Sequence, residues 1–169
     1  MIERGRPKGD GMAILNYTTK IDPIKTAGEI QGILASKGAK SINIDYASGE
    51  PVALWFKIEV RGVDISFRLP CNWEGVEQAM RRDRTVQPRY QSRDQAKRVA
   101  WRIVKDWVEA QLAIIESGQA EIGEVFLPYA IVGEHGQTLF QKIQSNPKLL
   151  TTGEGPPTQQ RDTIEEELL

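Results

Sequence analysis

SRDQAKRVAWRIVKDWVEAQLAIIES, residues 92–117, is the longest continuous helical pattern in this 169-residue chain. Ser92 followed three positions later by Gln95 forms a capping box, which predicts where the helix begins. Two adjacent apolar rows follow at helical spacing: Ala96, Val99, Ala100, Ile103, Trp107, Ala110 and Ile114, and then Trp101, Val104, Val108, Leu112 and Ile115. So broad an apolar stripe predicts that the helix packs against a sheet and that a second segment covers the rest of the stripe. That cover is either the segments 121–132 and 138–143 or a second copy of the chain.

Three strand patterns lie upstream of this helix. They are SINIDY (41–46), VALWFKIEV (52–60) and VDISFRL (63–69), with Arg61–Gly62 as a tight hairpin turn between the last two. Alternation places one row toward a core: Ile42, Ile44, Val52, Leu54, Phe56, Ile58, Val60, Val63, Ile65, Phe67 and Leu69. The sequence therefore predicts an antiparallel meander with one covered face and one wet face.

The remaining elements complete an α+β fold. AILNYTT (13–19) suits an opening strand, residues 22–38 suit a helix capped by Asp22, and a short helix follows Asn72. The predicted architecture is an antiparallel β-meander with an N-terminal strand and helix, packed by a long C-terminal helix. The pattern of residues 118–145 leaves helix and strand open.

Domain organisation is predicted from composition. Residues 1–11 lack apolar periodicity and are expected to be a flexible N-terminal extension, and translation starts at either Met1 or Met12. Residues 12–145 are expected to form a single domain. Residues 146–169 are rich in Gly, Pro, Gln and acid and are expected to be a disordered acidic tail. No apolar run approaches the length of a membrane span, so we expect a cytoplasmic protein with no membrane partner.

Two scarce residue types limit the chemistry. Cys71 is the single cysteine and His135 the single histidine, so an intrachain disulfide and a Cys/His zinc site are excluded. Cys71 is predicted to be a small, partly buried residue between a strand and a helix. With no Gly-rich phosphate loop and no nucleophile elbow either, we expect no enzyme activity, cofactor or metal.

Charge is concentrated in one segment. The whole chain is nearly neutral, with 22 basic and 23 acidic residues, but residues 81–105 hold nine basic residues against two acidic ones. Residues 151–169 are acidic. A local excess of this size suits a polyanionic partner, so we predict a nucleic-acid-binding site. Its residues are Arg81, Arg82, Arg84, Arg89, Tyr90, Arg93, Lys97, Arg98, Arg102 and Lys105.

Within this site, Arg98, Arg102 and Lys105 are three or four positions apart, as are Arg93 and Lys97. We expect these cations to form a basic ridge on the long helix, away from its apolar rows. Tyr90 is a candidate for stacking on a base. Trp101 and Trp107 lie in the apolar rows and are predicted to be core residues. The alternative is a ridge that docks on an acidic protein surface, including the chain's own acidic tail. A homo-oligomer also fits the pattern.

A third reading is a nuclease of the PD-D/E-x-K type. Asp45 and the Glu59–Arg61 segment are similar to the paired carboxylates that hold magnesium there. Arg61 replaces the lysine, and no proline precedes Asp45. Alternating charges on the wet face of a strand explain the same residues, so this remains the remote alternative.

The runs FRLPCNWEGVEQAM (67–80) and RDQAKRVAWRIVKDWVEAQLAIIESGQAEIGEVFLPYAI (93–131) resemble small proteins of bacteriophages and integrated mobile elements. The likeness covers about residues 12–145. These proteins carry no assigned functional motif, so no residue role transfers. The resemblance implies a setting of replication, recombination or counter-defence accessories. We therefore expect a non-enzymatic, nucleic-acid-binding accessory protein, with a protein-binding modulator as the alternative.

Overall fold

The computed structural model describes residues 14–133 and 136–150. The predicted extension 1–11, Met12, His135 and residues 151–169 of the predicted tail lie outside these described residues. The helices and strands, in chain order, are α1 Pro23–Ser36, β1 Ser41–Ala47, β2 Glu50–Val60, β3 Val63–Leu69, α2 Trp73–Arg82, η1 Pro88–Tyr90, α3 Arg93–Glu116, α4 Ile122–Phe126, η2 Leu127–Tyr129, β4 Ile131–Val132, β5 Gln137–Thr138, α5 Leu139–Ser145 and η3 Pro147–Leu150. The predicted α+β class is confirmed.

The strands β1, β2 and β3 form the predicted antiparallel meander. Arg61 and Gly62 both have positive φ, 51° and 82°, and form the tight β2–β3 turn that the sequence predicts. Two residues of the predicted core-side row are exposed. Val63, beside the β2–β3 turn, is 62% exposed, and Val52 lies at an irregularity of the β1–β2 pairing. Asp45 pairs with Ala53 and Tyr46 with Pro51, so Val52 is an extra residue in a bulge and is 40% exposed.

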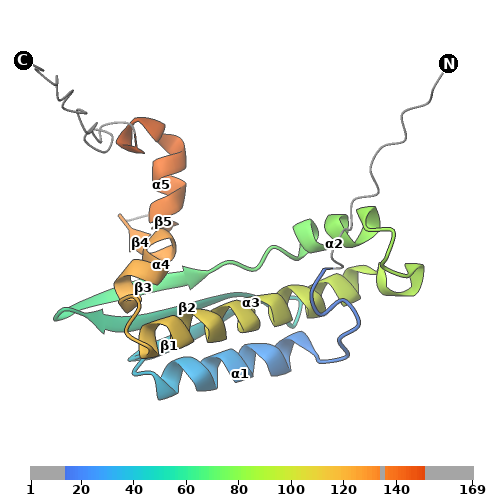
Figure 1. Cartoon of the computed structure of the whole chain (residues 1–169), viewed down its shortest axis with the longest axis horizontal. Coiled ribbons are helices and arrows are strands. Elements are labelled where there is room, and N and C mark those ends of the chain that lie inside the picture. Colours follow the sequence, from blue (N-terminus) through green and yellow to red (C-terminus); the bar gives the residue numbers. More distant parts are fainter. Residues whose placement is uncertain (1–13, 134–135, 151–169) are drawn as a thin grey trace, which may run out of the picture.

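Helices α1 and α3 lie side by side on one face of the sheet (Figure 1). The core between the layers joins residues of the sheet, α1 and α3. Its buried members include Leu54, Phe56, Phe67, Ile30, Leu34, Trp101, Val108 and Leu112. Trp101 is 2% exposed and half-buried Trp107 packs against the same core, so both tryptophans are core residues as predicted.

The segment after α3 covers the other side of this helix. Phe126, at the end of α4, is fully buried, and its ring lies 5.5 Å from those of Phe56 and Trp107. Ala130 then forms an isolated antiparallel β-bridge with Phe67 of β3. The short strands β4 and β5 pair with each other, and α5 follows them. The predicted second cover by residues 121–132 is therefore confirmed. The other predicted part of this cover, residues 138–143, packs mainly on η2, β4 and η3 instead, and Phe140 is 53% exposed. Helix α1 adds a cover that the sequence does not predict. The α3 stripe needs no second copy of the chain.

The predicted opening strand is wrong. Residues 15–18 form a turn, with Asn16 at φ 62° and its carbonyl accepting a hydrogen bond from Thr19 N. The side chain of buried Gln95 donates hydrogen bonds to the carbonyls of Tyr17 and Thr19, 2.8 and 2.7 Å away. These contacts satisfy backbone groups that a strand would pair with a neighbouring strand.

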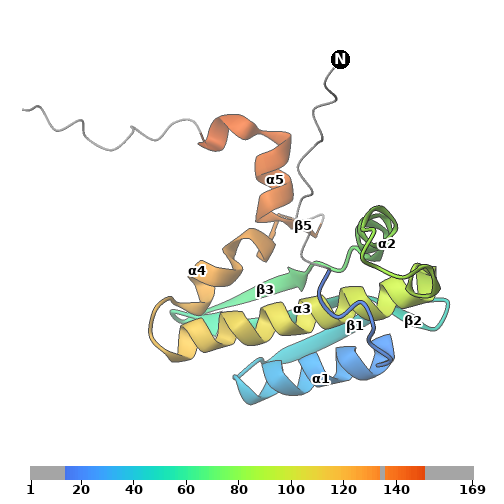
Figure 2. The same cartoon turned by 45° about the vertical axis from the view of Figure 1, so that its right-hand side comes forward.

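Helix α2 stands over the first turns of α3 (Figure 2). A second, smaller core holds the two helices and the turn together. It consists of Met80, Val86, Ala96 and Val99, with Ile14, Tyr17, Val76, Tyr90 and Ile103 around them. Among the described residues, no helix combines the length and the apolar character needed to cross a membrane.

Candidate nucleic-acid interface

The loop between α2 and α3 is held in one conformation by its own side chains. Asp83 Oδ1 accepts hydrogen bonds from the hydroxyl and the backbone N–H of Thr85, at 2.6 and 2.8 Å, and these bonds lower the pKa of Asp83. Val86 is 2% exposed in the small core, and Gln91 donates to its carbonyl at 2.9 Å. Ser92 then caps α3 as predicted, with its hydroxyl accepting a hydrogen bond from Gln95 N at 3.2 Å. The reciprocal half of the predicted capping box is wrong, because the Gln95 side chain donates to the carbonyls of Tyr17 and Thr19 instead. The chain therefore turns a fixed corner between the helices.

Five arginines project from this corner, and all five are exposed. We call them the arginine corner: Arg81 and Arg82 on the last turn of α2, Arg84 in the loop, Arg89 in η1 and Arg93 at the start of α3. Asp83 is the one acidic residue among residues 81–93. The positive field here is therefore little compensated within the segment.

Contacts made by the arginine corner are those of exposed side chains. Arg81 pairs with Glu77 at 2.8 Å, Arg82 Nε donates to Gln78 O at 3.3 Å, and the guanidinium groups of Arg89 and Arg93 lie over the rings of Tyr90 and Trp73 at 4.8 and 5.4 Å. Exposed pairs and cation–π contacts contribute little each. A phosphate group can compete for these guanidinium groups at small energetic cost.

Tyr90 has a structural role that its sequence position does not reveal. Its ring is half-buried and meets Tyr17 edge to face, with centroids 5.6 Å apart. The ring also packs on the small core below, and Arg89 lies over it. Stacking of a base on Tyr90, the predicted role, requires Arg89 to move aside.

The cations of α3 differ from the predicted free ridge. Arg102 Nη1 lies 2.7 Å from Glu29 Oε2 of α1, and the side chain of Arg102 is only 16% exposed. Lys105, 12% exposed, lies between Glu109 at 2.5 Å and Glu29 at 3.9 Å. The reason is tertiary, because α1 lies along this side of α3 and brings Glu29 to both cations.

Lys97 and Arg98, which also belong to the predicted ridge, make contacts within the fold as well. Lys97 pairs with Glu50 at the start of β2, and its Nζ is 5.5 Å from the Trp73 ring centroid. Arg98 is half-buried, with Nη1 3.5 Å from Gln95 Oε1. The ten predicted site residues thus divide into two groups. One is the arginine corner with Tyr90, and the other is four further cations of α3, of which Lys97, Arg102 and Lys105 pair with residues of neighbouring elements.

We expect the Arg102–Glu29 pair to stabilise the fold. Arg102→Gln should lower the free energy of unfolding by about 1 to 2 kcal/mol, because the partly buried Glu29 carboxylate loses the nearer of its two cations and keeps Lys105 at 3.9 Å. Urea denaturation followed by circular dichroism measures this change. Arg84→Gln is the control, with an expected change below about 0.5 kcal/mol. Equal stability of the two variants would contradict a structural role for Arg102.

One sequence signal could have identified this pair. Glu29 lies between Ala27 and Ile30, both fully buried, so its position borders the core-facing side of α1. A carboxylate at such a position needs a cationic partner from a neighbouring helix. Which helix supplies that partner is not visible in the sequence.

Asp45 and Glu59, the two carboxylates of the nuclease hypothesis, lie far apart on the sheet. Asp45 is opposite Ala53, six residues along β2 from Glu59, which corresponds to about 20 Å. Asp45 accepts a hydrogen bond from Trp55 Nε1 at 2.7 Å, Glu59 pairs with Lys40 at 2.8 Å, and Arg61 forms two hydrogen bonds with Glu121. Asp45 and Glu59 cannot share one magnesium ion. Among the described residues, no cluster of three potential metal-ligating side chains occurs.

The face of the sheet opposite α1 and α3 is a rival surface for a polyanion. A hollow of about 450 Å³ there is lined by side chains that include Asn43, Trp55, Lys57 and Ser66. The Arg68 guanidinium lies over the Trp55 ring at 5.1 Å. Two cations beside one tryptophan make this face the natural comparison for the arginine corner.

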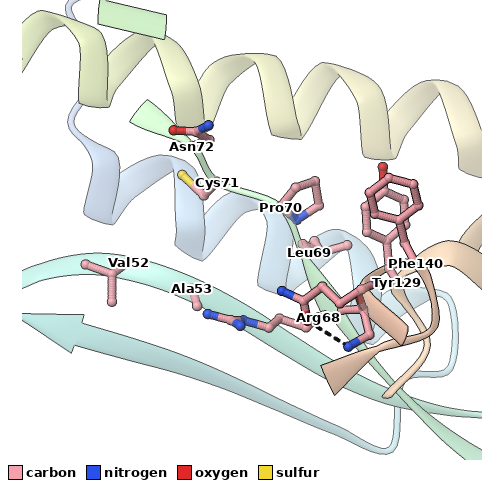
Figure 3. A pocket seen from close by; sticks show the side chains of 11 residues that line it. Val52, Ala53, Arg68, Leu69, Pro70, Cys71, Asn72, Tyr129 and Phe140 are labelled. Atoms are coloured by element: carbon pink, nitrogen blue, oxygen red, sulfur yellow. Dashed lines mark hydrogen bonds between the residues drawn. The ribbon is translucent and has the colours of Figure 1, made fainter. Parts of the chain in front are cut away.

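A smaller pocket of about 300 Å³ lies between the β2–β3 strands and the C-terminal segment. Figure 3 shows Val52, Leu69, Pro70 and Phe140 around it, so its walls are mainly apolar. Cys71 is half-buried there, between β3 and α2, as predicted. Burial raises the pKa of its thiol to about 12, so the thiol stays protonated at neutral pH and is a poor nucleophile.

Comparison with known proteins adds no functional assignment: no protein-family model, curated protein or solved structure matches the chain.

Proposed function

We propose that this protein is a non-enzymatic accessory protein of a phage or mobile element that binds nucleic acid through the arginine corner. The observation that carries the proposal is that five exposed arginines lie within residues 81–93, where the chain turns from α2 into α3. Asp83 is the one acidic residue in this segment. The phage or mobile-element setting rests on the sequence resemblance.

Arginine suits phosphate recognition better than lysine does. The planar guanidinium group donates two parallel hydrogen bonds to phosphate oxygens and keeps its charge at every physiological pH. Because the corner is held by Asp83, Val86 and Gln91, little backbone entropy is lost when a polyanion binds. These contacts are with the backbone of the nucleic acid, so they suit DNA and RNA alike.

The proposal is tested by binding of the wild-type protein to labelled duplex DNA, single-stranded DNA and RNA, followed by fluorescence anisotropy. Each phosphate contact releases condensed counterions, so three to five contacts predict a slope of log K against log salt of roughly −2.7 to −4.5 on duplex DNA. If none of the three nucleic acids binds at low salt, the proposal fails and an acidic protein surface becomes the partner of choice.

A further inference from the structure

The two edges of the three-stranded sheet differ. The β3 edge is partly covered, because Ala130 bridges Phe67 and the chain continues into β4 beside it. Strand β1 forms the other edge, and within residues 14–133 and 136–150 no strand pairs with its outer side. An open edge presents a row of unpaired backbone N–H and C=O groups.

Strand β1 has few of the features that usually protect such an edge. Its sequence, SINIDYA, contains no proline and no lysine, and Asp45 is its single charged residue. On the side facing the helices, Ile42 and Ile44 are only half-buried and Tyr46 is 54% exposed. The corresponding residues of β2, such as Phe56, are buried. The apolar row of β1 is therefore incompletely covered.

Helix α1 extends the same surface. Its solvent-facing positions carry a single charge, on Lys25, and Ile24 is 50% exposed. Gly28 and Gly32 are also exposed there, and a Cβ atom built on either would touch nothing within 4 Å. Each glycine lowers helix stability by roughly 0.5 to 1 kcal/mol relative to alanine. Within the part of the chain that the structure describes, no close neighbour requires a glycine at either position.

We propose that two copies of the chain pair through their β1 strands, antiparallel across a two-fold axis at Asn43, so that two three-stranded sheets form one sheet of six strands. This pairing satisfies the open backbone groups of both edges. It also brings the two weakly charged α1 helices to the same side of the joined sheet, because α1 packs on β1.

The side chains of β1 are self-complementary in this register. Ile42 lies opposite Ile44 of the second copy, so the half-buried apolar rows cover each other. On the wet face, Asn43 meets its own copy, and Asp45 lies opposite the Ser41 hydroxyl. No pair of like charges is opposed. In an isologous interface the same segment of both copies is in contact, so that segment must be complementary to itself. Strand β1 meets this requirement, and a second copy therefore suits this edge better than an unrelated peptide.

A cysteine at the axis tests the pairing directly. Residues opposite each other in an antiparallel pair have Cα atoms about 4.5 to 5.5 Å apart, within the range of a disulfide. In a Cys71→Ser background, Asn43→Cys should therefore form a covalent dimer under mild oxidation. The matched control is Lys57→Cys, exposed on the same face of β2, because two such residues would lie more than about 14 Å apart in the dimer.

We expect Asn43→Cys to cross-link at least about tenfold faster than Lys57→Cys, since paired cysteines react at a high effective concentration. Analytical ultracentrifugation of the full chain should show twice the monomer mass, and Asn43→Lys should weaken the dimer at least about tenfold through like charges at the axis. Both experiments are done without nucleic acid, so their results are independent of the proposed function. A monomer at every concentration, or equal cross-linking of the two cysteine variants, overturns the proposal.

Discussion

Trp101→Ala is expected to lower the free energy of unfolding by about 3 to 5 kcal/mol, one of the largest effects of any single substitution in this chain. Trp101 is 2% exposed in the core between α3 and the sheet, and its Nε1 donates a hydrogen bond to Pro51 O at 3.1 Å. Alanine removes the ring contacts, opens a cavity and leaves that buried carbonyl without its partner. Urea denaturation followed by far-ultraviolet circular dichroism measures the loss.

Trp55→Ala is the matched control, since it deletes the same side chain from the wet face of the sheet. Trp55 is half-buried, and its contacts include Asp45 and Arg68 at the surface. We expect a loss of about 1 kcal/mol or less. Similar losses for Trp101→Ala and Trp55→Ala would show that α3 does not pack on the sheet as described.

Replacing the whole arginine corner by glutamine should reduce the affinity for duplex DNA at least about 100-fold at low salt, because five potential phosphate contacts are lost together. The double variant Arg84→Gln/Arg89→Gln should flatten the salt slope by about two. Melting temperatures should change little, because all five side chains are exposed and contribute little to the core. Fluorescence anisotropy over a salt series measures both affinity and slope.

Lys57→Gln/Arg68→Gln is the control, with two cations removed from the rival face of the sheet. Its affinity and slope should equal those of the wild type. If this variant loses binding while Arg84→Gln/Arg89→Gln does not, nucleic acid lies on the sheet, and Trp55 becomes the stacking residue.

The elements with a local sequence pattern are predictable from the amino-acid sequence alone. The capping box of Ser92 and Gln95 predicts the start of α3, and the Arg61–Gly62 pair predicts the hairpin. Alternation predicts the meander, and apolar spacing predicts that Trp101 is core. Each of these depends on residues a few positions apart, whose backbone preferences and spacing are the same in any tertiary context.

The opening segment shows where local pattern fails. AILNYTT has the composition of a strand, but a strand exists only with a neighbour that pairs with its backbone N–H and C=O groups. Gln95, 78 positions from Tyr17, supplies the partner instead and holds a turn. The bulge at Val52 has a similar cause, because strand register is a property of two strands together.

The candidate site also has a part that is predictable from the sequence and a part that depends on tertiary packing. Five exposed arginines close together in the chain are evident from the sequence, because they share one turn between two helices. The contacts of Arg102 and Lys105 with Glu29, and of Lys97 with Glu50, follow from how the helices and strands pack. The strength of an ion pair depends on the distance between the two charged groups. For residues far apart in the chain, that distance is set by the packing of the helices and cannot be read from the order of charges in the sequence.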